Sequence, residues 1–147
     1  MITYTEESFE ELWERMQELV PLHDQEVNLL PDYELDPDLS KFRHFQNSGM
    51  FLCCAAWDGD TLVGYIMDVI DTHTLYKTVL FAHCDLYFVK KEYRGRCARG
   101  LLRFIENIER EMGVVARLTK SLDVNRAGDF FKAIGYSQAE VVWVRRL

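Results

Sequence analysis

The passage from residue 86 to residue 112 constrains the fold most, because an apolar run there gives way to a basic turn and then to an amphipathic helix. The apolar run ends at Val89, and charged residues follow it. Large apolar residues then recur at helical spacing, at Leu101, Leu102, Ile105, Ile108 and Met112. The pattern predicts a strand, a tight turn and a helix in direct succession. The first amides of a helix lack partners within it, and Arg94, Arg96 and Arg99 add positive charge at that end, so we expect an anion site suited to a phosphate-bearing cofactor.

Length and charge limit what the rest of the chain can be. At 147 residues and 48% hydrophobic, it is long enough for one cored domain and too short for two, so we expect a single domain over residues 1–147. A net charge of −7 argues against a nucleic-acid partner. The sequence shows neither a secretion signal nor an apolar run of membrane-spanning length. Neighbouring Cys53 and Cys54 would point to opposite faces of a strand, which disfavours a disulfide framework. We therefore expect a reduced, cytoplasmic protein without membrane contact.

The N-terminal region predicts a short strand over residues 2–4, followed by a helix. Thr5 is the expected N-cap of this helix, and Pro21 is its expected end. One face of the helix would carry the residues that pack inward, which are Phe9, Leu12, Trp13, Met16 and Leu19. We expect this helix to cover one face of a sheet.

A second helix and a hairpin are expected next. Asp36 as N-cap and Pro37 in the first turn predict a helix over residues 36–46. The apolar runs 50–57 and 62–70 flank a short polar turn, which is typical of an antiparallel hairpin.

The next segments predict a βαβ unit. After a polar loop at residues 71–77, we expect a long strand over residues 78–89 and a helix over residues 98–112 that ends at Gly113. Residues 114–119 are rich in β-branched side chains and predict a strand parallel to the long one. Parallel neighbours often diverge to admit a ligand at their carboxyl ends.

The C-terminal region predicts a short helix capped by Asn125 and a final strand at residues 141–144. The whole chain then has an α/β (α+β) fold. Its central sheet is mixed and mostly antiparallel, with one parallel βαβ crossover and helices on both faces.

Two local motifs resemble those of a known family. Residues 94–100 are similar to a pyrophosphate-binding loop of the form Arg/Gln-x-x-Gly-x-Gly/Ala, and residues 125–136 are similar to a later asparagine followed by a short aromatic helix. Together with the order of the elements, they make nearly the whole chain resemble the GCN5-related N-acetyltransferase (GNAT) family. Short acetyltransferase-like proteins encoded by bacteriophages have a similar appearance.

The resemblance implies a site for acetyl-CoA. The pyrophosphate would lie on the amides of the turn and of the helix start, and pantetheine would pair with the end of the long strand, where the Val89 amide is a candidate oxyanion donor. The residues expected to bind the cofactor are Phe88, Val89, Arg94, Gly95, Arg96, Cys97, Ala98, Arg99, Gly100 and Asn125. For Arg94 to Gly100 a solvated turn is the alternative, and Asn125 could equally be only a helix cap.

Three residues depart from the family pattern. Cys97 and Arg99 stand where the family usually has small residues, and their side chains would narrow the approach to the pyrophosphate. Phe131 stands where many members have a tyrosine that protonates the departing thiolate, and phenylalanine has no proton to give. The thiol of Cys97, among three arginines, is either activated or a small packing residue, and we favour packing.

The long strand carries the candidates for proton removal from an attacking amine. Asp85, His83 and Tyr87 alternate along it, so we expect them on one face, with Asp85 as the first choice. The alternative is a polar pair at a sheet edge with no catalytic role.

The function implied is transfer of an acetyl group from acetyl-CoA to a primary amine, on a small molecule or on a protein lysine or N-terminus. Acidic residues between Asp24 and Asp38 hint at a cationic acceptor. The histidines lack ligand spacing with cysteines or carboxylates, so we expect no metal. The alternative is a catalytically weak or inactive module that binds a partner protein. A homodimer or a host-protein partner is possible, and the apolar residues 141–144 could either finish the sheet or pair with a second copy.

Overall fold

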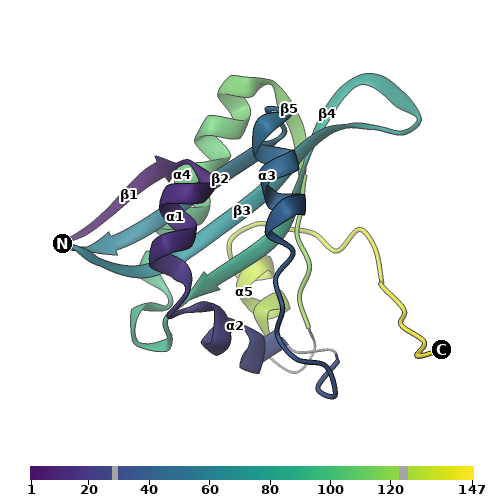
Figure 1. Cartoon of the computed structure of the whole chain (residues 1–147). Helices are drawn as coiled ribbons and strands as arrows, with labels where there is room; N and C mark the ends of the chain where they lie inside the picture. The colour runs from purple at the N-terminus through teal and green to yellow at the C-terminus, as the bar shows by residue number, and fades with distance from the viewer. Residues whose placement is uncertain (28–29, 123–125) are drawn as a thin grey trace.

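The computed structural model describes the chain except residues 28, 29 and 123–125. Its centre is a five-stranded sheet in the order β1-β2-β3-β4-β5 (Figure 1). The strands are β1 (Ile2–Glu7), β2 (Phe51–Asp58), β3 (Thr61–His73), β4 (Tyr76–Val89) and β5 (Val114–Leu118). Neighbouring strands are antiparallel up to β4, and only β4 and β5 are parallel. The predicted fold class, with its one parallel crossover, is confirmed.

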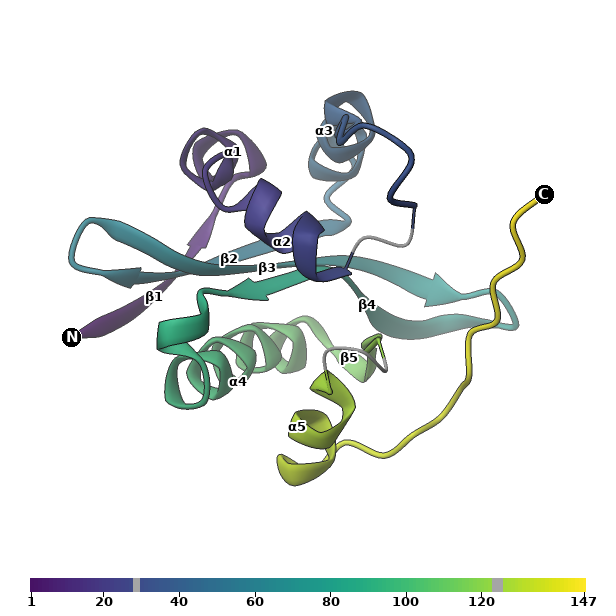
Figure 2. The same ribbon diagram turned by 90° about the horizontal axis from the view of Figure 1, so that it is seen from below.

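Helices cover both faces of this sheet, as Figure 2 shows. One face carries α1 (Phe9–Met16), α2 (Val20–Val27) and α3 (Leu39–Asn47), and the other carries α4 (Arg96–Met112) and α5 (Ala127–Ala133). Each face has its own apolar cluster, centred on Phe9, Leu12 and Tyr65 on the first and on Ile66, Leu101 and Ile105 on the second. Alternate residues of the central strands supply the two clusters, which is why those strands read as continuous apolar runs.

The N-terminal elements differ from the sequence prediction in their boundaries. β1 runs on to Glu7, and Ser8 rather than Thr5 caps α1, because Ser8 and Glu11 form a reciprocal capping box. Pro21 does not end the first helix. It lies in the first turn of α2, where a missing N–H costs nothing.

Two further boundaries move in the middle of the chain. The N-cap of α3 is Asp38, which accepts a bond from the Lys41 amide at 3.1 Å, and not Asp36. The predicted loop at residues 71–77 is largely strand, because β3 and β4 pair almost to their tight turn.

The βαβ unit is confirmed, with α4 between β4 and β5 and a left-handed Gly113 ending the helix. The short 3₁₀ helix η1 (Lys91–Tyr93) and Gly95, at φ 85°, make the turn between β4 and α4. The predicted cap Asn125 lies outside the described residues.

The predicted final strand at residues 141–144 is wrong, because the segment has no regular secondary structure. Its side chains are exposed, and Trp143 is 88% exposed. Figure 1 shows the C-terminal segment running away from α5 beyond the β5 side of the sheet. The four cysteines are free thiols. Among the helices in the described part of the chain, none is long and apolar enough to cross a membrane.

Candidate functional site

A β-bulge interrupts β4 at Asp85. Leu86 pairs with Met67 and Cys84 pairs with Asp68, so Asp85 is left without a partner on β3. A bulge bends its strand and redirects the side chains that follow. Asp85 is exposed at this bend.

The outer edge of β4 opens at the same level. Pairing of β4 with β5 ends at His83 and Leu118. Beyond that pair, the described residues supply no strand neighbour on this side of β4. The last six residues of β4 therefore hydrogen-bond to β3 on one side only.

Backbone hydrogen bonds show which groups face the open edge. The Lys90 amide bonds to the Val63 carbonyl on β3 at 2.8 Å. Because bonding direction alternates along a strand, the backbone groups of Phe88 also face β3, and those of Val89 and Tyr87 face the open edge. The expected backbone contact of Phe88 with pantetheine is therefore wrong, since its carbonyl lies against Gly64 of β3.

The three candidate proton acceptors do not share a face. The extra residue in the bulge reverses the alternation, so Ala82 and Cys84 before it and Tyr87 after it all pack toward α4. The hydroxyl of Tyr87 donates to the Ala98 carbonyl at 3.0 Å, and burial raises the pKa of this phenol. His83 is exposed on the other face of the strand, where its ring stacks on Phe81 at 6.4 Å.

The start of α4 offers three amides. Its first internal hydrogen bond joins the Arg99 amide to the Gly95 carbonyl at 3.0 Å, so the amides of Arg96, Cys97 and Ala98 precede it. The amides of Arg99 and Gly100 belong to the helix ladder, which narrows the expected anion site to the first turn.

Two residues of the predicted loop serve the core. A Cβ on Gly100 would lie 1.9 Å from the Tyr4 hydroxyl oxygen, so the missing side chain makes room for Tyr4. Cys97 is 4% exposed, and burial raises the pKa of its thiol. Burial and a raised pKa both favour the packing interpretation of Cys97 over an activated thiol.

The three arginines of the loop are exposed, but Arg94 already has partners. Its Nη2 lies 2.5 and 2.6 Å from the two carboxylate oxygens of Glu26 on α2, and its Nε donates to the Val89 carbonyl at 3.0 Å. Arg94 thus ties α2 to the end of β4. Nothing in the sequence pattern links Glu26 to this loop, because the contact joins residues 68 positions apart.

A cavity of about 410 Å³ lies beside this ion pair, and its lining comes from α2, the end of β4 and the turn that follows. The lining residues are Leu22, Gln25, Glu26, Phe88, Lys90, Lys91 and Glu92. Next to it, His23 stacks on Phe88 at 5.2 Å and hydrogen-bonds through Nδ1 to the Tyr65 hydroxyl at 2.8 Å. Burial lowers the pKa of His23, which favours the neutral form of its ring.

Phe131 lies on the α4 side of the sheet, 6% exposed, with its ring 6.3 Å from that of Tyr87 and 5.3 Å from that of Tyr136. It is a core residue. In the described part of the chain, no three or more His, Cys, Asp and Glu side chains are grouped to hold a metal ion.

Comparison with known proteins agrees with this geometry. The acetyltransferase (GNAT) family model matches residues 7–136. Because of this match, the chain belongs to the GNAT family, and its enzyme class is that of the acetyl-CoA-dependent N-acetyltransferases. No curated protein matches the sequence.

Several solved structures share the fold at low sequence identity. One is an aminoglycoside acetyltransferase from an uncultured soil metagenomic sample, in complex with trehalose, with a TM-score of 0.78, 15% identity and coverage of 99% of this chain and 95% of that one. A ribosomal-protein-alanine N-acetyltransferase from Brucella melitensis has a TM-score of 0.74, 13% identity and coverage of 100% and 99%.

A third structure is AAC(6')-Iy in complex with the bisubstrate analog CoA-S-monomethyl-acetylneamine, with a TM-score of 0.72, 15% identity and coverage of 100% and 98%. The bacteriophage source suggested by the resemblance has no support among these structures.

Proposed function

We propose that this acetyltransferase passes an acetyl group to a cationic primary amine, which attacks the thioester directly. The observation that carries the proposal is the coincidence of three features on β4: the bulge at Asp85, the end of pairing with β5 at His83, and the open edge that leads from there to the first turn of α4. Together they leave an unpaired strand edge along which an extended pantetheine arm could bind, between a phosphate site and an exposed carboxylate.

The diphosphate would be bound at the start of α4. The amides of Arg96, Cys97 and Ala98 would donate to its oxygens, and the exposed side chains of Arg96 and Arg99 would supply counter-charge. Arg94 would join them on leaving Glu26. Asn125, outside the described residues, remains a proposed contact.

The open edge of β4 sets where the thioester can lie. The Val89 and Tyr87 amides face it, and four residues of strand, about 13 Å, separate Val89 from Asp85. Val89 is therefore better placed to bind pantetheine near the phosphate site. Tyr87, two residues from the bulge, is the better oxyanion donor through its amide.

Asp85 would accept the proton of the attacking amine, directly or through one water, because its carboxylate is exposed at the bulge beside the opening strands. His83, two residues earlier and also exposed, is the second choice. The departing thiolate must take a proton from another donor than Phe131. The proton lost by the amine, relayed by Asp85 or by water, would protonate the departing thiolate.

The cationic acceptor is inferred from charge and from a relative. Exposed acidic residues run from Asp32 to Asp38, and Glu26 lines the cavity beside the end of β4. Solved structures of the same fold include aminoglycoside acetyltransferases, whose substrates carry several amines.

The test is release of free coenzyme A from acetyl-CoA in the presence of a panel of amines: an aminoglycoside, a polyamine, a lysine-rich peptide and an alanine-terminated peptide. We expect the cationic small molecules to be acetylated fastest. Turnover of the alanine-terminated peptide alone would overturn the choice of acceptor, and binding of coenzyme A without any turnover would overturn the proposed transfer.

A second candidate is a module that binds another protein or a second copy of itself. Exposure of Val141, Val142, Trp143 and Val144 favours it, since four adjacent apolar side chains in solvent are unusual for a monomer. Light scattering on the full chain and on a chain that ends at Glu140 would detect self-association through this segment.

A further inference from the structure

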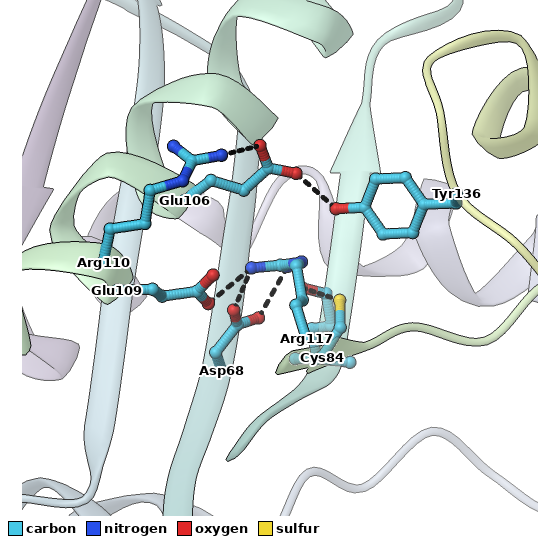
Figure 3. A network of polar contacts seen from close by, with 8 residues as sticks. Asp68, Cys84, Glu106, Glu109, Arg110, Arg117 and Tyr136 are labelled. Carbon is cyan, nitrogen blue, oxygen red and sulfur yellow. Dashed lines mark hydrogen bonds and ion pairs between the residues drawn. The ribbon is translucent and has the colours of Figure 1, made fainter. Parts of the chain in front are cut away.

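A row of polar side chains crosses the sheet on its α4 face at the level of the bulge (Figure 3). Arg117 of β5 donates through both terminal nitrogens to the carboxylate of Asp68 on β3, with Nη2 3.0 Å from Oδ1. Its Nη1 also lies 2.6 Å from Oε1 of Glu109 on α4. The three side chains are between 0% and 6% exposed.

The cluster raises the pKa of one of its carboxyl groups. Burial raises the pKa of Glu109 to about 9, and the hydrogen bond that protonated Glu109 donates to the Asp68 carboxylate adds to the effect. The raised pKa favours the protonated form of Glu109 beside the guanidinium of Arg117. The titratable neighbours of the cluster are Cys84 on β4, Tyr136 after α5, and Glu106 on the same helix as Glu109.

Stability alone is a poor reason to keep such a cluster. Buried ion pairs are often no more stabilising than well-packed apolar side chains of similar volume, because removing charges from water is costly. Here the arrangement is also incomplete, since Nε of Arg117 is buried without a partner among the described residues. A buried polar group of this kind calls for an explanation other than stability.

The position of the cluster suggests an explanation for its presence. Asp68 pairs with Cys84, the residue immediately before the bulge. Arg117 pairs with Ala82, one step before the last β4–β5 pair. The cluster thus joins β3, β5 and α4 at the point beyond which β4 pairs with β3 but no longer with β5.

We propose that Arg117 is a positioning residue of the acetyl-CoA site: held by Asp68 and Glu109, it fixes the point at which β5 leaves β4, and with it the width of the open edge beside the bulge. The proposal rests on the proposed binding of acetyl-CoA along that edge. It predicts that disturbing the cluster weakens cofactor binding out of proportion to any loss of folding stability.

Two variants test it. Arg117→Lys keeps the charge and removes the planar fork that reaches both carboxylates. The combined variant Asp68→Leu, Glu109→Leu and Arg117→Met replaces the whole cluster by apolar side chains, and we expect it to melt at or above the wild-type temperature. For both, we expect Kd for free coenzyme A and KM for acetyl-CoA to rise about tenfold or more, with KM for the amine unchanged.

The matched control is Arg110→Lys. Arg110 pairs with Glu106, and both residues are on α4, so this variant should leave Kd for coenzyme A unchanged. If Arg117→Lys does not fold, the coenzyme A affinity of the combined variant tests the proposal instead. Wild-type affinity in a folded variant would overturn the positioning role and leave a structural cluster. Failure of the wild-type chain to bind coenzyme A would instead overturn the proposed cofactor site, so the two failures are distinguishable.

Discussion

Two adjacent stretches of β4 are held differently. From Leu80 to His83 the strand has hydrogen-bonded neighbours on both sides, β3 and β5. From Cys84 to Val89 it has β3 alone, and no strand of the described residues pairs with its other edge. The bulge at Asp85 lies just past the boundary.

The difference shows how one strand serves as both scaffold and site. The doubly paired stretch is fixed by the sheet and by the Asp68–Arg117–Glu109 cluster beneath it. The singly paired stretch keeps backbone groups free for a ligand, which an ordinary strand interior cannot do. Rigid support next to unpaired backbone is what a site for an extended cofactor needs.

The largest expected effect is on kcat, when the exposed carboxylate of the singly paired stretch is removed. Asp85→Asn should lower kcat about 100-fold or more, because the amide cannot accept a proton from the amine, while Kd for coenzyme A stays near the wild-type value. Steady-state kinetics and calorimetry measure the two quantities. Asp71→Asn, an exposed aspartate on β3, is the control and should change neither. Equal losses in both variants would remove Asp85 from the mechanism.

A second experiment asks whether Gly100 serves packing or the cofactor. Gly100→Ala should destabilise the fold by about 1–3 kcal/mol, because the new Cβ would collide with Tyr4. In a Tyr4→Ala background the same change should cost much less, so a double-mutant cycle in urea measures the coupling. Loss of coenzyme A affinity without loss of stability would mean that Gly100 faces the ligand.

The third experiment tests the raised pKa of Glu109, which lies beside the guanidinium of Arg117. The folded-state pKa of Glu109, raised to about 9, exceeds its unfolded value. Its contribution to stability is therefore complete below pH 4 to 5 and is lost as the pH rises toward 9, at up to about 1.4 kcal/mol per pH unit. Glu109→Gln should flatten this slope in denaturant titrations at several pH values, and Glu111→Gln, on the exposed side of α4, should not. A wild-type stability that increases between pH 6 and pH 9 would contradict the assignment.

The smallest expected effect concerns the link from α2 to the open stretch. Glu26→Gln should tighten coenzyme A binding by about two- to fivefold, because it frees Arg94 from an exposed ion pair of modest strength. Glu14→Gln, on α1, is the control. Weaker binding in Glu26→Gln would show that Glu26 positions Arg94 for the phosphate rather than competing with it.

Much of this architecture could be predicted from local pattern. The order of β4, turn, α4 and β5 follows from an apolar run, a basic turn and helical spacing, all of which are local signals. Ser8 was missed as the cap of α1 because Thr5 also precedes acidic residues, and only the reciprocal bonds with Glu11 decide between them. The strand expected at residues 141–144 was wrong, because β propensity needs a partner strand to take effect.

The candidate site was harder to predict, because its key features are relations between distant residues. A bulge is a mismatch of register between two strands, so the sequence of β4 alone placed Tyr87 on the wrong face. The buried cluster did leave a signal. Asp68 is the single acid within the apolar run 62–70, and Glu109 lies on the apolar face of α4. Charged residues at core positions indicate buried partners.

The most direct test of the central claim is an amide chemical-shift titration of the wild-type chain with coenzyme A. The claim is that the open edge of β4 and the first turn of α4 form the cofactor site. It predicts that the largest shifts fall on Tyr87, Val89, Arg96, Cys97 and Ala98, while the doubly paired residues from Leu80 to His83 change little. Saturating coenzyme A that leaves those five amides unshifted would contradict it.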